Sequence, residues 1–86
     1  MTTSELLARI VDPLPPEVLE AVGQRLTGQP RNWQTPLAGL LHVTPQAVRH
    51  WKGGARLCTG PVVVAMAALV KVRELEEELK RWRVFE

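Results

Sequence analysis

The sequence predicts an all-α protein, a small helical bundle of about five helices that ends in one long C-terminal helix. Most apolar residues recur at spacings of three or four, as on the buried face of a helix. Threonine-proline and glycine-proline pairs mark helix starts, because proline suits the first helical position. No strand-like alternation interrupts this pattern. A chain of 86 residues suits one core, so we expect a single domain over residues 1–86.

The N-terminal third predicts two helices. Ser4 is a candidate cap for a short first helix with an apolar face of Leu6, Leu7 and Ile10, and the proline-rich run 12–16 ends it. A second helix is expected over residues 16–26, followed by Gly28, with an apolar face of Val18, Leu19, Val22 and Leu26. In the loop that follows, Trp33 is expected to pack onto the core; stacking on nucleic acid is the alternative.

Residues 34–53 predict two short helices joined by a tight turn. Thr35-Pro36 and Thr44-Pro45 each have the form of a helix start, in which the threonine hydroxyl accepts a bond from a first-turn amide. Two starts nine residues apart leave room for about two turns of helix between them. This is the geometry of a helix-turn-helix.

The last helix is expected over residues 61–84, beginning after Gly60. Its first half is nearly all apolar and is expected to be covered on most sides. Its second half carries an apolar seam at spacings of three, four and three, formed by Val72, Leu75, Leu79 and Trp82. We expect this seam to join two copies of the chain. The alternative is that the helix folds back on its own domain.

Charge is distributed unevenly, although the net charge is only +2. Every acidic residue lies at or before Glu20 or at or after Glu74. The charged residues between them are all basic: Arg25, Arg31, Arg49, Lys52, Arg56, Lys71 and Arg73. Such a middle section attracts a polyanion such as DNA. The alternative is an ordinary solvated surface whose acids cluster at the two ends.

A helical wheel of residues 44–53 separates a buried side from an outward side. Ala47, Val48 and Trp51 share the side expected to be buried. The opposite side carries Gln46, Arg49, His50 and Gly53. In a major groove the first three of these can bond base edges or phosphates. The alternative is the polar face of a surface helix.

Residues 34–53 resemble the helix-turn-helix of the Cro and phage-repressor class, the XRE-like regulators. The resemblance rests on aliphatic residues, alanine, tryptophan and glycine at the family's motif positions, here Leu37, Ala38, Leu41, Val43, Val48, Trp51 and Gly53. It implies a recognition helix in the major groove of DNA. The DNA-binding residues expected here are Gln34, Thr44, Gln46, Arg49, His50, Lys52 and Arg56.

Two positions depart from the family's pattern. His42 stands where glycine is usual, in a turn that favours a left-handed backbone. Pro45 stands at a position that often reads a base, so base readout is expected to rest on the three polar residues of the outward side.

An enzyme, a metal site and a cofactor are not expected. His42, His50 and Cys58 match no common zinc spacing and leave a structural site one ligand short. The acids between Glu74 and Glu78 are most simply a solvated helix face, and Cys58 is expected to be a small, partly buried side chain. The most apolar run, 61–70, is too short to cross a membrane, and no basic leader opens the chain, so we expect a cytoplasmic protein.

Three functions remain open at this point. The first is a transcriptional regulator, a repressor of phage or mobile-element origin that binds an inverted-repeat operator as a homodimer. The second is a protein-interaction module, antitoxin-like or an adaptor, whose last helix binds a second protein partner. The third is a nonspecific nucleic-acid-binding protein, which the modest net charge disfavours.

Overall fold

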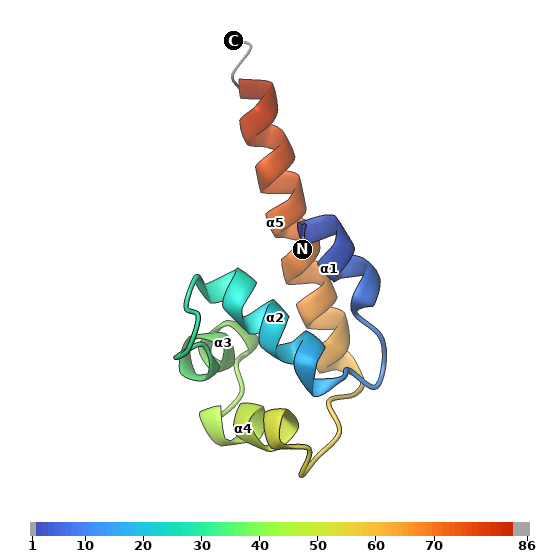
Figure 1. Cartoon of the computed structure of the whole chain (residues 1–86), viewed down its shortest axis with the longest axis vertical. Coiled ribbons are helices and arrows are strands. Elements are labelled where there is room, and N and C mark those ends of the chain that lie inside the picture. The colour runs from blue at the N-terminus through green and yellow to red at the C-terminus, as the bar shows by residue number, and fades with distance from the viewer. Residues whose placement is uncertain (1, 84–86) are drawn as a thin grey trace.

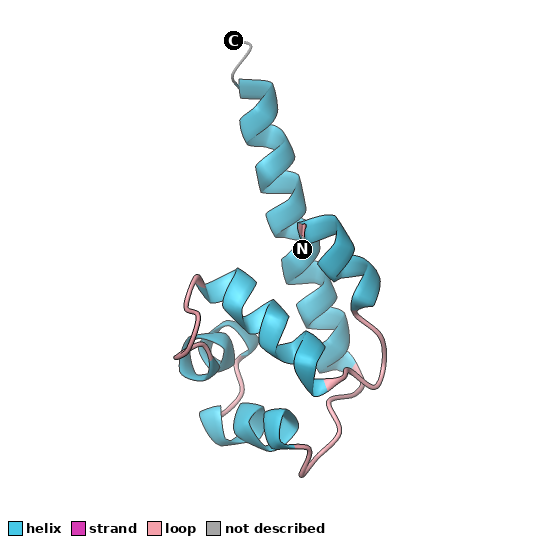
Figure 2. Ribbon diagram, in the orientation of Figure 1, coloured by secondary structure: helices cyan, strands magenta, loops and turns pink. Residues whose placement is uncertain are grey.

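The computed structural model describes residues 2–83, and five helices follow one another in this part of the chain. They are α1 (Thr3–Arg9), α2 (Pro16–Thr27), α3 (Gln34–Leu41), α4 (Pro45–Gly53) and α5 (Pro61–Arg83). The predicted all-α bundle with a long C-terminal helix is therefore confirmed (Figures 1 and 2). Val84, where the last helix was expected to end, lies outside the described residues.

The first helix begins earlier than its sequence pattern predicts. Thr2, with an extended backbone, is the cap, and its hydroxyl accepts a hydrogen bond from the Glu5 amide at 3.1 Å. The prediction that Ser4 caps this helix is wrong. The Ser4 hydroxyl instead donates to Oε2 of Glu74 on α5 at 2.6 Å, so it links α1 to α5.

The third helix also begins before its predicted cap. Trp33 already has helical backbone angles, and its carbonyl accepts from the Leu37 amide at 3.0 Å, so α3 starts at Gln34. Thr35-Pro36 therefore lies within the first turn and does not precede it. Proline is tolerated there because a first-turn amide has no partner inside the helix.

Trp33 is the largest fully buried side chain and confirms the predicted core position, with 1% of its surface exposed. It packs against Gly23 of α2, where the absence of a side chain leaves room for the indole ring. A Cβ atom at Gly23 would lie 2.2 Å from Cε3 of Trp33. The loop between α2 and α3 is fixed further by Gln24, whose side-chain amide donates to the Pro30 carbonyl at 2.9 Å. Trp33 thus sets how α2 and α3 lie against each other.

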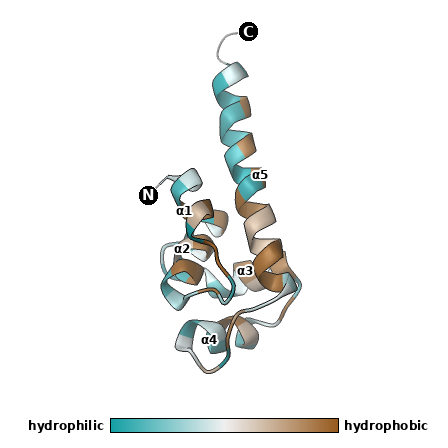
Figure 3. Cartoon of the chain, turned by 90° about the vertical axis from the view of Figure 1, so that its right-hand side faces the viewer, coloured by the Kyte–Doolittle hydropathy of each residue, from teal (hydrophilic) through white to brown (hydrophobic). Residues whose placement is uncertain are grey.

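The last helix belongs to the core along one half only. Val63, Met66 and Val70 are buried, whereas Val64 is 69% exposed, so the apolar first half is covered less completely than predicted. The C-terminal end of the helix projects beyond the other four helices, which makes the molecule 48 Å long and little more than 20 Å across (Figures 1 and 3). None of the described helices combines the length and apolar character needed to cross a membrane.

The packing of Trp33 leads to a prediction about glycine. Gly23→Ala should lower the free energy of unfolding by about 1–3 kcal/mol, because the new methyl group overlaps the indole ring. Chemical denaturation measures this change. Gly39→Ala is the matched control, since Gly39 is helical and has open space where the methyl group would go. The control should be neutral or stabilising by up to about 1 kcal/mol, and equal losses in both variants would contradict the packing account.

Candidate nucleic-acid interface

The helices α3 and α4 pack against each other across the turn at residues 42–44. Leu37 of α3 and Val48 of α4 are both fully buried. His42 takes the left-handed conformation expected of this turn position (φ 57°, ψ 40°), and the Val43 amide donates to the Ala38 carbonyl at 3.0 Å. The turn therefore has the backbone that glycine usually supplies, held here by histidine.

The start of α4 follows its sequence signal. Thr44 is the cap with an extended backbone, and its hydroxyl accepts from the Ala47 amide at 3.2 Å. Pro45 occupies the first helical position, where its missing donor costs nothing. The threonine-proline pair thus fixes where α4 begins and which of its residues point outward.

The outward side of α4 is polar and free of acids. Gln46 and Arg49 are exposed, and His50 is half-buried; we call these three residues the α4 face. On the inward side Val48 is fully buried, but Trp51 is only half-buried at the edge of the core. The wheel therefore assigns Val48, Gln46 and Arg49 correctly, but it is wrong for Ala47, which is half-buried and lines the outward hollow described below, and Trp51 contributes less to the core than predicted.

A hollow of about 180 Å³ brings together four of the residues expected to bind DNA. It is lined by Thr44, Gln46, Ala47, His50 and Arg56. Arg56 reaches it because the chain turns back after α4, where the Arg56 amide donates to the His50 carbonyl at 3.3 Å. The loop arginine therefore joins the polar residues of the helix on one concave surface. Arg49 lies on the same helix but does not line this hollow.

The other two expected residues, Gln34 and Lys52, do not line this hollow. Gln34 is the first residue of α3 and is half-buried. Lys52 lies near the end of α4, and its Nζ is 3.6 Å from Oε2 of Glu20 on α2. Sequence reasoning missed this pair, since the two residues belong to different helices and no local spacing relates them. Both side chains are partly exposed, so Lys52 can exchange this weak ion pair for a phosphate.

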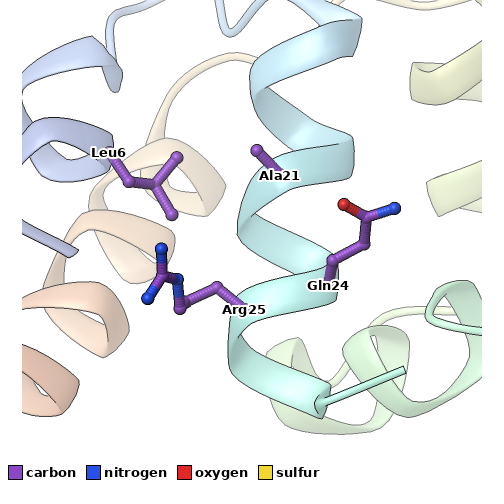
Figure 4. Close-up of a pocket in the computed structure, with 4 residues that line it drawn as sticks. All are labelled: Leu6, Ala21, Gln24 and Arg25. Atoms are coloured by element: carbon purple, nitrogen blue, oxygen red, sulfur yellow. The ribbon is translucent and has the colours of Figure 1, made fainter. Parts of the chain in front are cut away.

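A second hollow, of about 500 Å³, lies between α1 and α2 and is lined by Leu6, Ala21, Gln24 and Arg25 (Figure 4). Arg25 donates to the Thr3 hydroxyl at 3.3 Å, and that hydroxyl donates to Oε1 of Glu77 at 2.8 Å. This chain of bonds links α2, α1 and α5. Thr3 is buried, and these two bonds give its hydroxyl both a donor and an acceptor. Through this chain of bonds, Arg25 of the hollow helps to hold the three helices together.

Cys58 lies in the loop before α5 and is almost fully buried, more than the partly buried position expected. Its carbonyl accepts from the Leu14 amide at 2.9 Å. Burial, and secondarily the negative charge of Asp12, raise the pKa of the thiol to about 11. Its thiolate is therefore scarce at neutral pH. Among residues 2–83, no three His, Cys, Asp or Glu side chains gather as a metal site would require.

The environment of Cys58 predicts slow alkylation. At pH 8 the native protein should react with iodoacetamide at least about 100-fold more slowly than the chain unfolded in guanidinium chloride, because the thiolate is suppressed and the side chain is covered. Mass spectrometry of timed samples measures both rates. Similar rates in the two states would show that Cys58 is accessible.

Comparisons with models of protein families, with curated proteins and with solved structures find no match to this chain. A proposal about function therefore rests on the geometry and chemistry of the surface around α4.

Proposed function

We propose that this protein is a sequence-specific DNA-binding transcriptional regulator that places α4 in the major groove. The observation that carries the proposal is the α4 face, a polar and acid-free surface on a short helix that is held by the buried Leu37 and Ala38 of α3 and by a tight turn. A helix of this size fits the major groove, where each base pair presents a distinct pattern of donors and acceptors.

The chemistry of the α4 face suits base recognition. Gln46 can donate and accept through its amide, as an adenine edge requires. Arg49 is exposed and carries five donors, which suit a guanine edge or a phosphate. His50 lines the hollow, and its imidazole can bond a base acceptor or a phosphate there. These residues are the proposed reading residues of the protein.

Contacts to the DNA backbone are expected from residues outside the α4 face. Arg56 lines the hollow together with Thr44. Lys52 lies near the end of α4, and Gln34 is the first residue of α3. Cationic side chains at the edge of a groove neutralise phosphates and position the protein without reading sequence. We assign Arg56 and Lys52 this positioning role, and we place the regulator in the cytoplasm with its DNA.

A homodimer is part of the proposal. One recognition helix reads only a few base pairs, so useful specificity requires two copies about one helical turn apart on an inverted repeat. The α5 stripe, formed by Val72, Leu75, Leu79 and Trp82, offers a surface for the second copy. These side chains are 50%, 50%, 52% and 72% exposed, so the chain does not fold them back on its own domain. Bound to a promoter, such a dimer acts as a repressor by occupying it.

The same exposed stripe supports a second candidate, a protein-interaction module of the antitoxin-like or adaptor kind. Here the α5 stripe binds a different protein, and the surface around α4 has no DNA partner. Fluorescence anisotropy with mixed-sequence duplexes separates the two functions. The regulator should bind at 50 mM salt and weaken steeply by 200 mM. Absence of binding at low salt would favour the adaptor.

Replacement of Arg49 tests the reading face. Arg49→Ala should weaken binding to the preferred duplex by about 1–3 kcal/mol and relax specificity at the contacted base pair. The melting temperature should stay unchanged, since the side chain is exposed. Arg9→Ala, which removes the same charge from α1, is the control and should leave affinity nearly unchanged. Equal effects of the two variants would remove Arg49 from the interface.

Replacement of Arg56 tests the phosphate contacts. Arg56→Gln should weaken all duplexes by a similar factor and flatten the plot of log affinity against log salt by about 0.9. Anisotropy titrations over a salt series give the slope for this variant and for Arg9→Gln. A loss confined to one sequence would instead show that Arg56 reads a base.

A further inference from the structure

The α5 stripe is part of a longer heptad pattern. Small residues continue its spacing toward the core, which gives the series Ala65, Ala68, Val72, Leu75, Leu79 and Trp82 at alternating intervals of three and four. These are the a and d positions of a coiled coil. Ala68 is exposed and Ala65 half-buried, so the pattern stays accessible where α5 enters the bundle. The small side chains of Ala65 and Ala68 let two α5 helices approach closely at the point where each helix joins the other four helices of its own chain.

The polar ties of α5 to its own domain lie away from this seam. Glu77 accepts from Thr3, and Glu74 accepts from Ser4. The Arg73 guanidinium donates to the Leu26 carbonyl at 3.3 Å. At 100° per residue, all three lie more than about 100° around the helix from the middle of the seam. The domain therefore braces α5 from one side and leaves the heptad side open.

We propose that α5 pairs with α5 of a second copy as a parallel, in-register coiled coil. This inference deepens the homodimer of the proposed function and rests on it for the orientation. The flanking charges supply the argument for a second copy. Lys71 and Glu78 occupy g positions, whereas Glu76 and Arg83 occupy e positions.

In a parallel pair each g residue faces the e residue of the next heptad of the other chain. Lys71 then faces the partner's Glu76, and Glu78 faces the partner's Arg83. Both pairs join opposite charges, and two-fold symmetry makes each occur twice. Lys71 already bonds Glu74 within one chain, so the pair of Glu78 and Arg83 tests the arrangement more cleanly.

The shape of the molecule favours the same orientation. The helix α4 lies at the end of the molecule opposite the free end of α5 (Figure 1). A parallel pair therefore sets both α4 helices at one end, where a single DNA duplex can meet both. An antiparallel pair would point them in opposite directions.

Charge reversal at the two flanking positions tests the orientation. Glu78→Lys or Arg83→Glu alone places like charges opposite each other in the parallel pair, and each should raise the dimer dissociation constant by about tenfold. The double variant E78K/R83E exchanges the two charges and should restore the wild-type value. Sedimentation equilibrium measures the constant for all four proteins.

An antiparallel pair gives the opposite result for the double variant. There g positions face g positions, and e positions face e positions. The double variant would carry Lys at residues 71 and 78 and Glu at residues 76 and 83, so only like charges would meet. A double variant weaker than both single variants would thus overturn the parallel arrangement.

Arg81→Glu is the matched control, because Arg81 is exposed on α5 but lies outside the a, d, e and g positions. It should leave the dissociation constant unchanged, and circular dichroism should show equal helix content in every variant.

A wild-type protein that stays monomeric up to 1 mM (roughly the weakest pairing of use in a cell) would overturn the pairing. DNA binding is measured separately. A parallel dimer that binds no duplex would refute DNA recognition and leave the coiled coil standing. A monomer that binds a half-site would refute the coiled coil and the homodimer and leave DNA recognition standing.

Discussion

The contact between Trp33 and Gly23 fixes the arrangement on which the rest of the molecule depends. The indole ring occupies the space of a missing side chain on α2, and burial of so large an apolar surface stabilises this one arrangement of α2 and α3. Because α3 then carries α4 through Leu37, Ala38 and Val48, the orientation of the α4 face follows from a contact that contains none of its residues.

The two halves of α5 serve different purposes. Val63, Met66 and Val70 close the core, while the projecting half is held near its base by bonds from Thr3 and Ser4 and by the bond of its own Arg73 to the Leu26 carbonyl. An exposed apolar stripe of this length is unusual for a chain that acts alone, since exposure of four large side chains to water is unfavourable. The proposed pairing gives the stripe a partner and gives α4 a second copy at the same end of the molecule.

The local signals of the sequence predict most helices and their outward faces. Thr44-Pro45 marks the start of α4 correctly because its capping bond is local, from the Ala47 amide to the Thr44 hydroxyl, and the left-handed turn at His42 follows from its position between two fixed helices. Thr35-Pro36 is misleading, since the buried Trp33 itself has helical backbone angles and α3 therefore starts at Gln34. Ser4 likewise bonds a residue 70 positions away. The pair of Lys52 and Glu20 and the approach of Arg56 to His50 are set by tertiary packing and the return of the loop, so no spacing reveals them.

Selection of bound sequences from a pool of random duplexes reports base recognition by α4 and the symmetry of the dimer in one experiment. We expect strong enrichment of an inverted repeat whose half-sites lie about one helical turn apart. A pool that remains random after several rounds at low salt would contradict it, since a reading face on α4 would then have no sequence to read.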